Sequence, residues 1–168
     1  SGRISFHVET FALGPLLEEI RVLAGARLGP GVTLTVDVAP DLPALDTDRV
    51  KLQEIVRNLV DNAIKFTDAG RVAVTARSGD TDTVIIEVSD TGRGISADEI
   101  ADVFEPFRQV GGHVRHAGVG LGLSIVKQLV EALGGDVSVA SVLGAGSRFR
   151  VEVPRGLPGG ERAHDSSP

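Results

Sequence analysis

The run from Leu52 to Thr67 constrains the fold of this chain more than any other stretch, because it carries two stripes of opposite chemistry. Its apolar residues recur at the spacing of three and four that places side chains on one face of a helix: Leu52, Ile55, Val56, Leu59, Ala63 and Phe66. Its polar residues repeat with the same period on roughly the opposite side: Glu54, Asn58, Asp61, Asn62 and Lys65. This second face is either solvated or able to bind Mg²⁺ and phosphates, since amide and carboxylate oxygens suit that ion.

Composition narrows the class of protein. The 168 residues suffice for one domain with a core, and 42% hydrophobic and 24% charged residues are typical of a globular chain. No apolar run approaches the ~20 residues that span a bilayer, no signal peptide is visible and there is no cysteine, so we expect a cytoplasmic domain. A formal net charge of −6 and the absence of Trp and Tyr argue against nucleic-acid binding.

Periodicity predicts further elements on both sides of this helix. Alternating residues predict strands over 3–9, 32–38, 72–77, 84–90, 136–141 and 147–153. Helical spacing predicts helices over 11–27 and 121–133, and a short helix capped by Ser96. The first of these helices should bury Leu13, Leu16, Leu17, Ile20 and Leu23. Asp46 or Thr47 should cap the helix that carries the two stripes.

The order of these elements predicts the fold class. Strands come in runs rather than in strict alternation with helices, which favours an α+β fold, a two-layer α/β sandwich. We expect the domain to span residues 1–153, because Gly, Pro, Ser and charged residues dominate from Pro154 onward. Residues 154–168 are then a flexible C-terminal tail or linker.

A carboxylate stands at the end of the strand over 84–90, directly before a glycine-rich bend. There Asp90 is followed by Thr-Gly-Arg-Gly-Ile. A buried carboxylate at a strand end can accept a hydrogen bond from an exocyclic amine such as adenine N6, and glycines let the backbone pass close to a flat ring. Taken on their own, the same residues fit a plain turn that joins a strand to a helix better than they fit a binding site.

A second glycine segment, over 118–123, runs directly into the helix predicted at 121–133. The free N–H groups at a helix start form a natural seat for phosphates. A dinucleotide-binding motif fits poorly, since a loop rather than a strand precedes the segment, and a P-loop is excluded because no Gly-Lys-Ser/Thr follows. Upstream, Phe104 and Phe107 flank a proline and could anchor the base of a loop over 108–117.

Taken in order, these segments resemble the catalytic ATP-binding domain of bacterial sensor histidine kinases, in the superfamily that also holds gyrase, mismatch-repair and heat-shock-chaperone ATPases. The asparagine box matches at Asn58, Asn62 and Lys65, and the phenylalanine box matches as FEPF at 104–107. The two glycine boxes match as DTGRGI at 90–95 and GVGLGL at 118–123, and the last box matches as GAGSRF at 144–149. The resemblance implies a mixed, mostly antiparallel sheet of about five strands covered on one face by about three helices.

The resemblance also implies roles for individual residues. Asp90 would recognise adenine, Asn58 and Asn62 would coordinate Mg²⁺, and Lys65 would touch the phosphates during catalysis with Asn58. Residues 108–117 would form a lid over ATP. The full set of nucleotide-binding residues that it implies is Asn58, Asn62, Lys65, Asp90, Gly92, Gly94, Ile95, Phe107, Arg108, Gly118, Val119, Gly120, Leu121, Gly122 and Leu123.

The resemblance implies transfer of the γ-phosphoryl group of Mg-ATP to a histidine on a separate dimerisation domain. It also implies a response regulator as the downstream partner. No His of this chain lies in a suitable helix motif, so the acceptor should lie on another domain of the parent protein, with or without a membrane anchor. The isolated domain should be a monomer. Alternatives with the same nucleotide fold are an ATP-hydrolysing enzyme, a serine protein kinase and a degenerate nucleotide sensor. Hydrolysing relatives place a water-activating Glu where this chain has Asn58, which favours the kinase.

Overall fold

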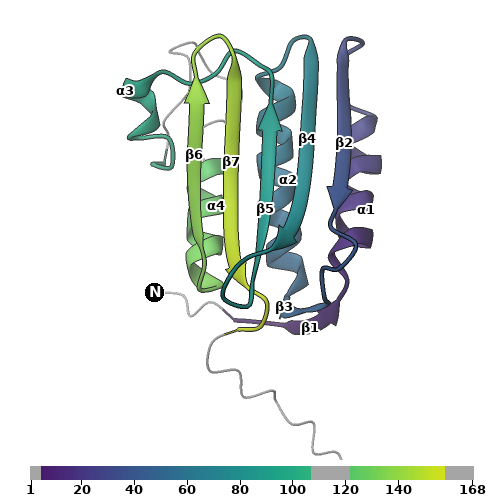
Figure 1. The fold of residues 1–168 in the computed structure, drawn as a ribbon. Coiled ribbons are helices and arrows are strands. Elements are labelled where there is room, and N and C mark those ends of the chain that lie inside the picture. The colour runs from purple at the N-terminus through teal and green to yellow at the C-terminus, as the bar shows by residue number, and fades with distance from the viewer. Residues whose placement is uncertain (1–4, 107–121, 158–168) are drawn as a thin grey trace, which may run out of the picture.

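A five-stranded sheet forms the framework of the computed structural model, which describes residues 5–106 and 122–157 (Figure 1). Its strand order is β2–β4–β5–β7–β6, and only the pair β2–β4 is parallel. The strands are β2 (Val32–Val38), β4 (Gly70–Ser78), β5 (Thr83–Asp90), β6 (Asp136–Val142) and β7 (Gly146–Pro154). The predicted mixed, mostly antiparallel sheet is therefore confirmed.

Three helices cover one face of this sheet, α1 (Leu13–Gly25), α2 (Arg49–Lys65) and α4 (Gly122–Ala132), as Figure 1 shows. A short helix, α3 (Ala97–Ile100), contacts β6, and Ser96 caps it as predicted. The apolar stripes of the three long helices and the inward residues of the strands make one continuous core. The two-layer α+β sandwich is confirmed, and the other face of the sheet has no helix on it among the described residues.

A second, two-stranded sheet lies across one end of the molecule. It pairs β1 (Val8–Phe11) antiparallel with β3 (Leu45–Asp48). The strand predicted over 3–9 starts later than expected, and β3 was not predicted at all. Four residues reading Leu-Asp-Thr-Asp carry little strand propensity, so this strand depends on its partner rather than on its own sequence.

Two further expectations about the helices are wrong. Asp48, rather than Asp46 or Thr47, caps α2, because the helix begins at Arg49 and the carboxylate of the residue before it accepts the N–H of Lys51. On α1 the side chain of Leu23 is 60% exposed, whereas the helix buries Leu13, Leu16, Leu17, Ile20 and Ala24. The buried stripe of α1 therefore ends at a small residue, Ala24, and the side chain of Leu23 lies on the outer side of the helix.

Ordered contacts continue past the predicted boundary at residue 153. Arg155 donates its backbone N–H to Asp82 and accepts from the N–H of Asp46 at 2.8 Å, and Gly156 forms a β-bridge to Asp46. These contacts join the end of β7 to β3. No helix in the described part of the chain is long and apolar enough to cross a membrane.

Candidate functional site

The polar face of α2 provides the first part of the site. Asp48 fixes where α2 begins, because its carboxylate accepts the N–H of Lys51 at 3.1 Å. The start of the helix in turn decides which residues lie on each face. Asn58 and Asn62 follow one turn apart, and both are half-buried. A Cβ atom added to Gly122 would lie 3.8 Å from Asn58 Oδ1, so this amide faces the start of α4.

The two amides are chemically suited to a ligand. Within residues 5–106 and 122–157, neither Asn58 nor Asn62 makes a side-chain hydrogen bond, although both are half-buried. Polar groups in this position usually find a partner. Amide oxygens one helical turn apart fit Mg²⁺ together with the phosphates that complete its coordination.

Asp61 belongs to a different surface from these two amides. Its carboxylate pairs with Arg27 at 2.7 Å, which ties α2 to the end of α1. Both side chains are more than a third exposed, so the pair contributes little to stability. The polar stripe predicted on α2 thus divides into an ion pair with α1, made by Asp61, and a face with two amides, of which Asn58 faces the start of α4.

Asp90 ends β5 and provides the second part of the site. Its side chain is 8% exposed, and Oδ1 accepts the backbone N–H of Gly92 at 2.9 Å. Burial raises the pKa of this carboxyl, while the N–H groups of Gly92 and Ser147 act in the opposite direction. The result is a buried hydrogen-bond acceptor fixed at the end of the central strand.

The loop after Asp90 fits between α2 and the β6–β7 turn only because two of its residues are glycines. A Cβ on Gly92 would come within 2.2 Å of the carbonyl oxygen of Phe66. Gly94 has a φ of +72°, and a Cβ there would approach the carbonyl oxygen of Val142 at 2.2 Å. The glycines therefore allow the loop after Asp90 to lie close to the C-terminal end of α2 and to the end of β6.

A cationic cluster at the end of α2 was not predicted. The guanidinium of Arg93 lies 4.7 Å from the centre of the Phe66 ring, and Lys65 Nζ lies 5.9 Å from it. Partial burial, and then the charge of Arg93, lower the pKa of Lys65. Phe66, expected in the core, is instead half-buried under these two cations. Two neighbouring positive charges favour an anionic ligand.

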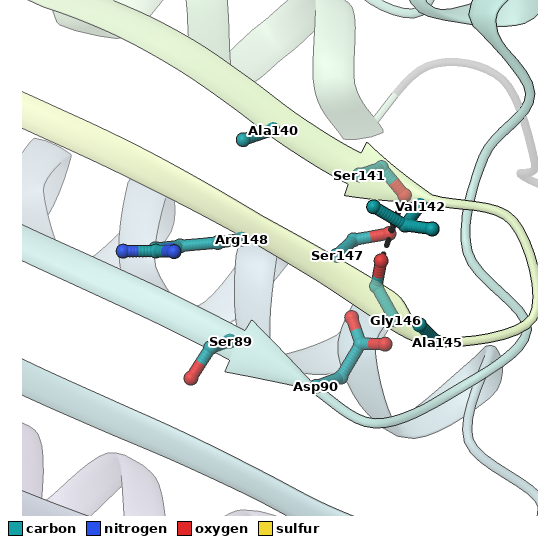
Figure 2. A pocket seen from close by; sticks show the side chains of 9 residues that line it. All are labelled: Ser89, Asp90, Ala140, Ser141, Val142, Ala145, Gly146, Ser147 and Arg148. Carbon is teal, nitrogen blue, oxygen red and sulfur yellow. Dashed lines mark hydrogen bonds between the residues drawn. The ribbon is translucent and has the colours of Figure 1, made fainter.

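A hollow of about 290 Å³ reaches Asp90 from the side of the β6–β7 turn, and Figure 2 shows the residues that line it. Its lining consists of Ser89, Asp90, Ala140, Ser141, Val142, Ala145, Gly146, Ser147 and Arg148. None of these residues comes from α2. The hollow is therefore not the space that the two amides face, and it shares only Asp90 with the predicted site.

The remaining predicted residues divide into two groups. Phe107, Arg108, Gly118, Val119, Gly120 and Leu121 lie outside the described residues. Ile95 and Leu123 are buried at 2% and 7% exposure, and their side chains pack in the hydrophobic core. Phe104 anchors its segment as expected, because its ring meets Phe149 edge to face at 6.1 Å.

The predicted site residues that the structure describes gather at one end of the sheet. The C-terminal half of α2, the end of β5 and the first residue of α4 meet there (Figure 1). The sequence did not indicate Phe66, Arg93, Ser141 or Ser147 as part of this region. Arg93 had one usable signal, its place between two glycines next to a buried carboxylate.

Comparisons with known proteins agree with this geometry. A family model described as histidine kinase-, DNA gyrase B-, and HSP90-like ATPase matches residues 47–157. The sensor histidine kinase RcsC of Escherichia coli K12 is 46% identical over 120 residues, which is 70% of this chain and 12% of RcsC. The sensor histidine kinase AtsR of Burkholderia thailandensis is 40% identical over 159 residues, which is 91% of this chain and 26% of AtsR.

A solved structure of similar fold is that of full-length ShkA in complex with AMPPNP. It superposes with a TM-score of 0.82 at 35% identity, over 92% of this chain and 32% of ShkA. The chain thus spans less than a third of the length of each of these three proteins. The match covers the two-layer sandwich and the elements that carry the candidate site.

Proposed function

Because the chain belongs to the family of histidine kinase-, DNA gyrase B-, and HSP90-like ATPases, we propose that it binds Mg-ATP and transfers the γ-phosphoryl group to a histidine on a separate helical domain. One observation carries this proposal. The amides of α2, the buried carboxylate of Asp90 and the start of α4 meet at one end of the sheet. The similarity to sensor histidine kinases supports the choice of acceptor.

Asp90 is the residue that would recognise the base. Burial raises the pKa of this carboxyl, and the N–H groups of Gly92 and Ser147 act to lower it. In its ionised form the carboxylate would accept a hydrogen bond from the exocyclic amine of adenine. A guanine carries a carbonyl oxygen at the same position, which would face this carboxylate as a second acceptor. Gly92 and Gly94 would leave room for the ring, since neither carries a side chain.

The phosphates would lie between α2 and the start of α4. Asn58 and Asn62 would hold Mg²⁺ through their amide oxygens, and bound Mg²⁺ would neutralise charge on the phosphates. Lys65 and Arg93 supply positive charge at the end of α2. The N-terminal end of α4, which begins at Gly122, offers backbone N–H groups and the positive end of the helix dipole.

The reaction needs little covalent chemistry from this domain. A histidine ring nitrogen attacks the γ-phosphorus, a new N–P bond forms, and the bond from phosphorus to the bridging oxygen breaks to release ADP. Catalysis then rests on holding the phosphate in line with the incoming nitrogen and on charge neutralisation. Asn58 favours transfer over hydrolysis, because an amide cannot take a proton from water near neutral pH.

The partners follow from this reaction. The acceptor would be a helical dimerisation domain of the same parent kinase, and the phosphoryl group would then pass to a response regulator. The domain would act in the cytoplasm, where its ATP is, whether or not the parent protein is anchored in a membrane. The isolated domain would be monomeric, since the dimerising helices would be on the other domain.

Magnesium-dependent binding of ATP tests the site itself. We expect Asn62→Ala to lose most of the gain in ATP affinity that Mg²⁺ gives the wild type, so that its dissociation constant at saturating Mg²⁺ is about tenfold higher. Isothermal titration with ATP, with and without Mg²⁺, measures this. The control is Asp61→Ala on the same helix, whose side chain pairs with Arg27 instead.

Two outcomes would count against the proposal. A magnesium titration of Asn62→Ala that matches the wild type would refute the metal role of this amide. Failure of the wild type to bind ATP at all would refute the nucleotide function.

A further inference from the structure

The hydroxyl of Ser141 joins three chain segments around Asp90. It lies at the end of β6 and accepts the backbone N–H of Ile95 at 2.8 Å. It also lies 2.9 Å from the carbonyl oxygen of Gly146 and 2.8 Å from the hydroxyl oxygen of Ser147. Figure 2 shows the two serine hydroxyls and Gly146 together beside Asp90.

The partners of Ser141 fix the direction of every hydrogen bond in this group. A hydroxyl has one proton and two lone pairs. The carbonyl of Gly146 can only accept, so Ser141 donates its single proton there, and the N–H of Ile95 can only donate. The remaining lone pair of Ser141 must accept the proton of Ser147. The lone pairs of Ser147 are thereby left for other donors.

Each partner of Ser141 belongs to a segment that contacts Asp90. Ser147 is paired with Asp90 across β5 and β7, and its backbone N–H acts on the Asp90 carboxylate. At Gly146 an added Cβ would lie 2.0 Å from the carbonyl oxygen of Asp90, so the two backbones are in close contact. Ile95 ends the loop whose Gly92 N–H binds Oδ1 of Asp90. Both segments that hold the carboxylate therefore meet at one hydroxyl.

We propose that Ser141 is a positioning residue for base recognition, which fixes the Asp90 carboxylate between its loop and β7 and so sets the preference for a 6-amino purine. This inference rests on the proposed function, in which Asp90 accepts the amine of adenine. A substitution that removes the hydroxyl leaves the N–H of Ile95 and the carbonyl of Gly146 without this partner and releases the hydroxyl of Ser147. The loop and β7 are then free to shift relative to each other.

The test compares two nucleotides that differ only at the recognised group. Mg-ATP carries the 6-amino group, and the Mg complex of purine riboside triphosphate lacks it. A general loosening of the fold would weaken both, whereas loss of base positioning weakens ATP selectively. Dissociation constants from isothermal titration, at one Mg²⁺ concentration, give the ratio between the two for each variant.

We expect Ser141→Ala to bind ATP about tenfold more weakly, the loss expected for one hydrogen bond to a charged group. Its affinity for purine riboside triphosphate should change less than about threefold by the same measure. Ser141→Thr keeps the hydroxyl and should retain the discrimination of the wild type. Ser138→Ala on the exposed side of the same strand is the matched control and should behave as the wild type does.

A Ser141→Cys variant decides the matter if the alanine variant does not fold, since a thiol keeps the volume but is a weak hydrogen-bonding group. We expect it to lose discrimination. If the wild type prefers ATP to purine riboside triphosphate and Ser141→Ala or Ser141→Cys keeps the same preference, the role of Ser141 is overturned. The proposed function is left intact by that result. A wild type that binds both nucleotides equally would overturn the assignment of Asp90, and the role of Ser141 with it.

Discussion

Asp90 is a buried hydrogen-bond acceptor whose position is fixed by the backbone around it. Its carboxylate is removed from water at the end of β5, which raises its pKa, and is held by the N–H groups of Gly92 and Ser147. A preformed acceptor of this kind discriminates strongly, because a ligand that cannot donate leaves a buried group unpaired. The backbone around Asp90 thus supports the base-recognition role proposed for it.

We predict that Asp90→Asn lowers ATP affinity at least about tenfold, since a hydrogen bond to a charged acceptor is lost. The fold should survive, because burial already disfavours the charged form that asparagine replaces. Isothermal titration with Mg-ATP and a thermal melt measure the two effects. Asp136→Asn, at an exposed position on β6, is the control. An unchanged ATP dissociation constant would contradict the assignment of Asp90.

Residues of the site were predictable where their motif is local. Asn58 and Asn62 share one helix face, and Asp90 precedes its glycines directly, so spacing alone indicates them. Arg93 over Phe66, and Ser141 beside Ser147, could not be predicted in this way. Their contacts join segments that are far apart in the chain or across a turn, and only the folded sheet brings them together.

At the scale of elements, α2 matters most, because its rotation decides which residues face α4. Its start is fixed by Asp48, whose buried carboxylate accepts from the N–H of His7, from the N–H of Lys51 and from Lys51 Nζ. Burial acts to raise the pKa of Asp48, but these hydrogen bonds outweigh it, and the pKa lies below the ordinary value of 3.8. Asp48 thus joins β1, β3 and α2.

We predict that Asp48→Ala lowers the free energy of unfolding by about 2 kcal/mol, the upper range for loss of an N-cap. Because the folded pKa is depressed, the charge of Asp48 stabilises the fold above its ordinary value of 3.8 and ceases to do so as the pH falls through the folded value. Asp48→Asn keeps a capping oxygen and should lose only this pH-dependent part.

Urea unfolding from neutral pH down to about 3 measures both variants of Asp48. Asp68→Ala, in an exposed turn, serves as the control. The stability difference between the wild type and Asp48→Asn should be constant near neutral pH and shrink below about 3.8. A difference that stays constant over the whole range would show that the charge of Asp48 does not stabilise the fold.

Elements with strong periodicity were predictable, and β3 was not. The strands β2, β4 and β5 alternate or carry β-branched runs, and α2 and α4 have clear apolar stripes, so their sequences alone indicate them. β3 is held by β1 on one side and by Arg155 and Gly156 on the other. Such a strand exists because of tertiary contacts that no local pattern records.

At the scale of the whole molecule, the candidate site and the two-stranded sheet lie at opposite ends of the five-stranded sheet. The end of β5, the C-terminal half of α2 and the start of α4 share one end, whereas β1, β3 and the end of β7 lie at the other (Figure 1). The fold class was predictable because strands come in runs, and the family's motifs lie in the same order along it.

Transfer of label from ATP to a histidine tests the central claim most directly. The domain is incubated with γ-labelled Mg-ATP, with and without the separately produced acceptor-helix domain of its parent protein, and Asp90→Asn is the inactive control. We predict acid-labile, alkali-stable label on the acceptor domain only, with little phosphate released in its absence. Steady release of phosphate without the acceptor, and no label on the acceptor when it is present, would contradict the account and favour an ATP-hydrolysing enzyme.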